Sequence, residues 1–179
     1  MKSCFAKLSV LRKLKIYANY NRRKQLAESL ILSKLDYAIS LFSNANQIEV
    51  NRLQKVMRSA ASFVTHKYCR TSDIINLHWI PMKERIDYYQ LKLAHKAIYD
   101  ETFPEYLKLT FKSRDSRLQN AQECTLPSNR DTKTFKGSIS RIFNDLPTNL
   151  RSEKKYNTFC RSLKQYQLDL AFARNISNI

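Results

Sequence analysis

The clearest hydrophobic pattern of the chain lies in the stretch 50–64. Apolar residues occur there at offsets that place them on one face of a helix with about 3.6 residues per turn. These residues are Val50, Leu53, Met57, Ala60, Ala61 and Val64. A second long helix is predicted over about 82–99, where apolar residues again repeat along one side from Met82 to Ala97. The middle of the chain is therefore expected to hold two long amphipathic helices.

The first 42 residues predict two more helices of different character. Between about 4 and 19 an apolar residue stands at every third position, so a helix there would carry a stripe that drifts around its axis. The stripe consists of Phe5, Leu8, Leu11, Leu14 and Tyr17. From about 21 to 42 apolar residues fall on nearly every face, which is typical of a central helix. Asp36 lies in that segment, where a carboxylate is expected to pair with a cation or accept hydrogen bonds.

Shorter elements are predicted after residue 70. Thr71 is expected to cap a short helix over 72–75, and Trp79 to anchor a corner of the core rather than to stack on bases. Another short helix is predicted near 138–144, and the last helix begins near Asn157. From 112 to 136 polar residues dominate without a sustained period, which predicts a surface connection with an extended piece at 123–126. Its arginines, expected either to follow a phosphate backbone or to be merely solvated, are Arg114, Arg117 and Arg130.

Together these elements predict a mainly α-helical fold, an irregular helical bundle of about five to six helices with a long loop around 111–136. We expect a helical region over 1–110, the surface connection over 111–136, and a C-terminal helical segment over 137–179 that packs on the first region. The 179 residues include one Gly and four Pro, which argues against a many-turned β-sandwich and excludes glycine-rich nucleotide loops. Uncharged runs are far shorter than the ~20 residues that a transmembrane helix needs, so no transmembrane segment is expected.

Few residues of the chain offer catalytic or metal-binding chemistry. The cysteines are widely spaced and lack a histidine at zinc-finger spacing, so we expect no metal or cofactor and four reduced thiols. They are Cys4, Cys69, Cys124 and Cys160. An independent enzyme would need a pocket that holds His66 or His78 together with Cys69, and no catalytic motif favours one.

The start of the chain bears on localisation. Basic residues interrupt the first 17 positions, which argues against a secretory signal and favours an intracellular protein, in the nucleus or the cytoplasm. No acidic residue precedes Glu28, which leaves a basic amphipathic mitochondrial presequence as the alternative.

Positive charge is the strongest functional signal. Lys and Arg number 32 against 15 Asp and Glu, a formal net charge of +17, which is typical of a protein with a polyanionic partner. The excess is concentrated at residues 1–45 and 111–179, with +7 in each against +3 for 46–110. Within 46–110 a row of three basic residues steps along one side of the predicted helix, where a solvated face is the alternative. The candidate contacts to an RNA or DNA backbone are Arg22, Arg23, Lys24, Arg52, Lys55, Arg58, Arg151, Lys154 and Lys155.

Several separate blocks of sequence, in a characteristic order over about residues 20–170, resemble one family. The first three blocks are Ser29-Leu30-Ile31-Leu32-Ser33-Lys34-Leu35-Asp36-Tyr37, Leu53-Gln54-Lys55-Val56 before Ala60-Ala61, and Leu77-His78-Trp79-Ile80-Pro81 before Lys83-Glu84-Arg85-Ile86. The later blocks are Pro104-Glu105-Tyr106-Leu107, Arg141-Ile142-Phe143-Asn144-Asp145-Leu146-Pro147, and Asn157-Thr158-Phe159 through Leu163-Lys164. The order resembles the C-terminal region, after the palm, of reverse transcriptases of non-LTR (LINE-type) retrotransposons of the Jockey group. Phe143 stands where that family often has Trp.

The resemblance implies a part of a larger RNA-directed DNA polymerase. In such enzymes the fingers and palm precede this region, and the metal-binding aromatic-x-Asp-Asp motif of the palm does not occur in this chain. The resemblance therefore implies a catalytically inactive, thumb-proximal helical fragment that helps to hold template and primer by electrostatic contacts. The alternative is a basic helical adaptor that docks on an acidic protein or an anionic membrane.

Overall fold

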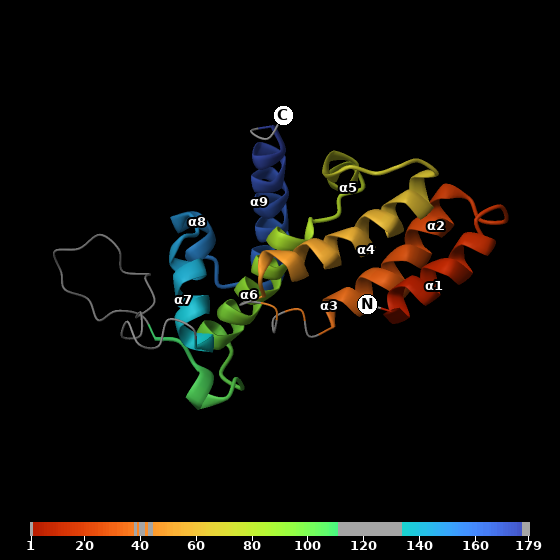
Figure 1. The fold of residues 1–179 in the computed structure, drawn as a ribbon. Coiled ribbons are helices and arrows are strands. Elements are labelled where there is room, and N and C mark those ends of the chain that lie inside the picture. The colour runs from red at the N-terminus through yellow and green to blue at the C-terminus, as the bar shows by residue number, and fades with distance from the viewer. Residues whose placement is uncertain (1, 38, 40–41, 43–44, 111–133, 177–179) are drawn as a thin grey trace. The chain divides into compact units, whose positions relative to one another are not determined.

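The structure, a computed structural model, describes residues 2–37, 39, 42, 45–110 and 134–176. The described residues are mainly α-helical and include no β-strand, which confirms the predicted fold class (Figure 1). The helices are α1 (Lys2–Lys13), α2 (Tyr20–Ala27), α3 (Ser33–Asp36), α4 (Gln47–Thr65), α5 (Thr71–Asn76), α6 (Met82–Tyr99), α7 (Phe135–Asn144), α8 (Thr148–Arg151) and α9 (Tyr156–Ile176). A π-helical turn, η1 (Glu28–Leu32), and a 3₁₀ turn, η3 (Glu105–Leu107), complete them.

The chain forms two compact units. Unit 1 comprises residues 1–86 and 167–179, and unit 2 comprises residues 87–166. The sequence-based division at 110 and 137 rests on composition, a different criterion, and stays a prediction. Most of the predicted connection, the extended piece at 123–126 and the three arginines of that loop lie outside the described residues.

In unit 1 helix α4 packs against α1 and α2 (Figure 1). The predicted apolar face of α4 is confirmed, because Met57, Ala60, Ala61 and Val64 are completely buried. The side chain of Asn46 begins the helix by accepting a hydrogen bond from the Glu49 N–H at 2.9 Å, which satisfies one of the donors that a helix start leaves free. The cap sets the start of the helix at Gln47, and the periodicity from Val50 onward gives the face that it buries.

Helix α1 buries only part of the predicted stripe, namely Leu8 and Leu11. Cys4, Leu8 and Leu11 are buried, whereas Phe5 and Tyr17 of the predicted stripe are exposed, and so is Leu14. The buried residues stand at offsets 0, 4 and 7, which keep to one side of an α-helix, while steps of three rotate away from it. The helix also ends at Lys13 rather than near 19.

The predicted helix over 21–42 is confirmed as far as Asp36, because the backbone stays helical from Tyr20 to Asp36. The structure divides it into α2, the turn η1 and α3, and α3 ends at Asp36. Ile31 is completely buried, but its neighbour Leu30 is partly exposed, so the segment is not buried on all sides as a central helix would be. The carboxylate of Asp36 pairs with Arg85, as expected, at 2.5 Å to Nε and 2.7 Å to Nη2.

Trp79 and the start of α5 test two further predictions. Trp79 is 3% exposed and its Nε1–H donates to Glu28 Oε1 at 2.8 Å, which confirms a core anchor. The N-cap residue of α5 is Arg70 rather than Thr71, so the helix begins at Thr71, one residue earlier than predicted. The Asp73 carboxylate accepts the Arg70 N–H, which stabilises this start.

Unit 2 has its own core. Ten buried apolar residues form one cluster: Leu91, Ala94, Ala97, Leu109, Ile139, Phe143, Leu146, Leu150, Phe159 and Leu163. They come from α6, α7, α8 and α9 and from the segments beside them. Phe143 is completely buried, so the aromatic ring at this position fills an apolar interior.

Candidate nucleic-acid interface

The basic row of α4 lies along one hollow of unit 1. Arg52, Lys55 and Arg58 line this hollow, which has a volume of about 470 Å³, together with Ile48, Asn51 and Gln54. Among the described residues that line it, none is acidic. Three cations on successive turns of a helix therefore share one concave surface, an arrangement that concentrates positive potential where an anion can enter.

A second hollow of about 410 Å³ shares Asn51, Gln54 and Arg58 with the first. Its other walls come from α5, the start of α6 and the end of α9, all within unit 1. It contains one carboxylate, that of Glu84, whose Oε1 lies 2.7 Å from Nη1 of Arg174. Because Arg174 neutralises that carboxylate, the charges of Arg58 and Lys83 make this hollow positive.

Gln54 and Arg58 carry buried polar atoms that face this region. The Oε1 atom of Gln54 accepts the N–H of Met82 at 2.8 Å, and Nη2 of Arg58 donates to Thr71 Oγ1 at 3.5 Å. In the described part of the chain, neither Nε2 of Gln54 nor Nε of Arg58 has a hydrogen-bond partner, although both atoms are buried. Gln54 was not among the residues predicted from the sequence.

The predicted contacts in α2 lie in a different part of unit 1. Arg23 uses Nε to donate to the carbonyl oxygen of Val64 at 3.0 Å and Nη1 to donate to that of Ala18. The bond to Val64 connects α2 to the C-terminal end of α4, and the bond to Ala18 holds the segment before α2, so Arg23 stabilises the fold. Arg22 is exposed and Lys24 is half-buried.

The predicted contacts near α8 belong to unit 2. Lys154 and Lys155 are exposed, whereas Arg151 is only 8% exposed, which conflicts with its predicted place on a phosphate-binding surface. The carbonyl oxygen of Arg151 accepts the hydroxyl of Tyr99 at 3.1 Å, whereas its side-chain atoms Nε and Nη1 are buried without a hydrogen-bond partner among the described residues. Of the nine candidates, the structure gathers Arg52, Lys55 and Arg58 around one hollow.

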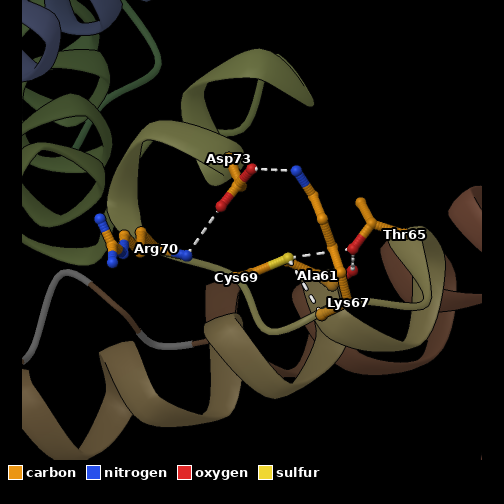
Figure 2. Close-up of polar contacts among 6 residues, drawn as sticks. All are labelled: Ala61, Thr65, Lys67, Cys69, Arg70 and Asp73. Atoms are coloured by element: carbon orange, nitrogen blue, oxygen red, sulfur yellow. Dashed lines mark hydrogen bonds and ion pairs between the residues drawn. The ribbon is translucent and has the colours of Figure 1, made fainter.

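Cys69 follows the end of α4 and is completely buried (Figure 2). Its Sγ lies 3.0 Å from Thr65 Oγ1 and 3.7 Å from the carbonyl oxygen of Lys67, and the Thr65 hydroxyl in turn donates to the Ala61 carbonyl at 3.0 Å. The thiol thus packs inside the turn between α4 and α5, where its contacts are a hydroxyl and a carbonyl.

An ion pair closes the same turn (Figure 2). Lys67 Nζ lies 2.6 Å from Asp73, whose other carboxylate oxygen accepts the Arg70 N–H at 2.9 Å. The hydrogen bond from Lys67, followed by that from the Arg70 backbone, lowers the pKa of Asp73, and the same contact with Asp73 raises the pKa of Lys67. The pair fixes the backbone between α4 and α5.

The two histidines considered for catalysis both have left-handed backbone angles. His66 caps the end of α4 with φ of 64°, and His78 has φ of 57°. Desolvation, then the charges of Arg23 and Lys15, lower the pKa of His66. A left-handed residue at a helix end commonly turns the chain out of the helix, which accounts for the position of His66.

His95 is the most enclosed histidine and lies in unit 2. It is 2% exposed, its ring stacks on Phe159 with centroids 4.4 Å apart, and its Nε2–H donates to the Glu153 carbonyl oxygen at 2.9 Å. Burial lowers the pKa of His95. Burial also raises the pKa of nearby Tyr156 to about 12, with Cys160 as the next cause. A hollow of about 430 Å³ borders this aromatic cluster.

Within the described ranges, no group of three or more His, Cys, Asp and Glu side chains could hold a metal ion. No helix of the described residues is both long and apolar enough to span a bilayer. Comparisons of the chain with protein-family models, curated proteins and solved structures give no match. What the geometry defines is a helical chain with a basic hollow on α4 that is lined by hydrogen-bond donors.

Proposed function

We propose that this chain is a catalytically inactive part of a retrotransposon RNA-directed DNA polymerase, the region after the palm, and that it binds RNA or DNA through the phosphate backbone. The observation that carries the binding role is the placement of Arg52, Lys55 and Arg58 around one hollow free of acidic residues in the described part of its wall. Cations read charge rather than base edges, so binding would be strong in low salt and weakly selective for sequence.

The polymerase origin draws its support from the ordered blocks of sequence between residues 20 and 170. Catalysis would reside in the palm and fingers of the parent protein, which would also be its partner. The genomic sequence upstream of the Met1 codon tests this origin, because it should encode an aromatic-x-Asp-Asp palm, even if frameshifted. An ordinary intron-bearing gene in that place would contradict the origin without touching the binding role.

The binding role is tested with a triple variant, Arg52→Gln, Lys55→Gln and Arg58→Gln, titrated with a generic RNA hairpin over a range of salt concentrations. For the wild type, the logarithm of the association constant should fall linearly with the logarithm of the salt concentration, with a slope of about −0.7 to −0.9 for each phosphate neutralised. The triple variant should bind more weakly and have a slope shallower by roughly two to three contacts.

A matched control removes the same charge from α1 through Lys7→Gln, Arg12→Gln and Lys13→Gln, all at exposed positions of unit 1. If both triple variants bind alike, diffuse charge rather than the α4 hollow accounts for affinity. A flat salt response of the wild type, or tighter binding to anionic vesicles than to RNA, would contradict nucleic-acid binding.

A further inference from the structure

Two buried donors on adjacent turns of α4 have no acceptor among the described residues. They are Nε2 of Gln54 and Nε of Arg58, and both side chains line the hollow of about 410 Å³. A buried donor without a partner costs about 1–3 kcal/mol, more for a charged group, so most such atoms in folded proteins are satisfied by something. Two of them in one wall indicate a missing acceptor.

Hydrogen bonds show which end of each amide is already engaged within the chain. The Oε1 atom of Gln54 accepts the N–H of Met82, the first residue of α6, which has no partner inside its own helix. The Oδ1 atom of Asn51 accepts from Nε2 of Gln47 at 3.0 Å. The oxygens of both amides are therefore already engaged, and Nε2 of Gln54 is left without a partner among the described residues. Asn51, Gln54 and Arg58 stand at offsets 0, 3 and 7, on one side of α4.

The charge of the hollow indicates the kind of acceptor. Arg58 and Lys83 line it, and the carboxylate of Glu84 is already paired with Arg174. Three donors from separate side chains suit an anion that accepts several hydrogen bonds, and the oxygens of a tetrahedral phosphate can be approached from more directions than those of a planar carboxylate. The volume is several times the ~30 Å³ that one water takes in the liquid, so a phosphate group fits with some of its hydration.

We propose that Asn51, Gln54 and Arg58 form a discrete phosphate-binding site in unit 1. Nε of Arg58 and Nε2 of Gln54 donate to the oxygens of one phosphate group, with Nδ2 of Asn51 as a third donor. The phosphate is either free in solution or a phosphodiester of a nucleic acid, and only the second source rests on the proposed function. The site differs from the surrounding basic surface because two of its donors are buried and fixed in direction.

The decisive variant is Gln54→Glu in the full chain. It is close to isosteric and keeps an oxygen for the Met82 N–H, but it removes the Nε2 donor and adds a negative charge to the wall of the hollow. Inorganic phosphate should raise the melting temperature of the wild type more than chloride does at the same ionic strength. In the variant this extra effect should be lost, with phosphate affinity at least roughly tenfold weaker, while the melting temperature in chloride stays equal or rises.

The control is Lys7→Gln, which removes one positive charge from an exposed position of α1 and should keep the phosphate effect. Arg58→Lys keeps the charge but lacks Nε, and should also weaken phosphate binding. If phosphate and chloride protect the wild type equally, the donors hold only water and the proposal is overturned. Equal phosphate responses of Gln54→Glu and Lys7→Gln overturn it as well.

A parallel titration with single-stranded RNA separates this inference from the proposed function. Salt-dependent RNA binding without a specific phosphate effect overturns the discrete site and leaves the proposed function standing. A phosphate effect that disappears in Gln54→Glu, together with no RNA binding, supports the site with free phosphate as its ligand and contradicts the proposed function.

Discussion

A row of cations on α4 in unit 1 and two lysines on α6 in unit 2 lie in different surroundings. In unit 1, Arg52, Lys55 and Arg58 border a hollow, and two buried donors in its neighbourhood lack acceptors among the described residues. In unit 2, the ammonium group of Lys92 lies 5.0 Å from the ring centre of Tyr89, and that of Lys96 lies 5.2 Å from the ring centre of Tyr156. The first set is open to a ligand, whereas the second is already attracted to the faces of aromatic rings.

This difference shows that net charge does not by itself locate a binding surface. Unit 2 also contains Arg151, which the sequence offers as a phosphate contact and the fold buries. The geometry of the acceptors around a cation decides whether it stabilises the fold or stays available. We expect substitutions in unit 2 to act mainly on stability and substitutions along α4 to act mainly on anion binding.

The largest effect on stability is expected for Phe159→Ala in unit 2. Phe159 is completely buried in the unit 2 core and stacks on His95, so its removal leaves a cavity and should cost about 3–5 kcal/mol. Hydrogen exchange should show a greater loss of protection for the amides of α7 than for those of α4. An equal loss in both helices would mean that the two units unfold as one, and the comparison between them would lose its energetic meaning.

A smaller loss is expected for Asp36→Asn in unit 1. The carboxylate accepts two hydrogen bonds from Arg85, with side chains that are 19% and 12% exposed, so the neutral amide leaves a mostly buried guanidinium without its charged partner. We expect the free energy of unfolding, measured with urea, to fall by about 2 kcal/mol, which is less than the loss for breaking a fully buried ion pair. Glu105→Gln, at an exposed position, removes the same charge and should change stability by less than about 0.5 kcal/mol.

His95 should make the stability of unit 2 depend on pH. Burial lowers the pKa of the folded imidazole below its ordinary value of 6.5, so between these two values the unfolded chain binds more protons than the folded chain. Stability should therefore fall as the pH drops below 6.5 and should not depend on this group above it. His95→Gln should flatten that part of the profile of unfolding free energy against pH.

The matched variant for this experiment is His66→Gln in unit 1. The pKa of His66 is lowered as well, but its side chain is exposed, so its substitution should change the profile less. If the two variants alter the slope equally, the enclosure of His95 has no energetic consequence.

The smallest effect is expected for Lys92→Met, which keeps an apolar stem and removes the charge from the aromatic faces. The free energy of unfolding, measured with urea, should fall by about 0.5–1 kcal/mol. The affinity for RNA should fall far less than in the α4 triple variant. Lys164→Met, exposed on α9, serves as the control. A drop in RNA affinity as large as that of the α4 variant would place unit 2 in the binding surface and remove the contrast.

Much of the fold follows from local patterns, and its departures have local causes. The face of α4 and the bounds of α6 were predictable because an apolar residue recurs with the helical period through both segments. The stripe predicted for the first helix was right at Leu8 and Leu11 but wrong at Phe5, which is apolar yet exposed, because burial depends on which neighbour is present. The π-helical turn after α2 leaves no periodic signal, since it lasts only from Glu28 to Leu32.

The candidate site was predictable only in part. The spacing of Arg52, Lys55 and Arg58 indicates one side of a helix, and the structure places them on one hollow. Gln54 was missed because its role depends on the N–H of Met82, 28 residues away, and no local pattern carries that contact. The offsets of Asn51, Gln54 and Arg58 were visible in the sequence, but amides on a helix face are common, and only tertiary hydrogen bonds orient them.

The turn η1 has a consequence for insertions and deletions. A π-helical turn holds about one residue more than an α-helical turn, so the helices on either side keep their rotational phase while the chain between them carries a surplus residue. Shortening the segment Ser29–Leu30 by one residue should yield a continuous α-helix in which Ala27 and Leu35 still point inward. The same deletion inside α4 would turn everything beyond it by about 100° and expose its apolar side.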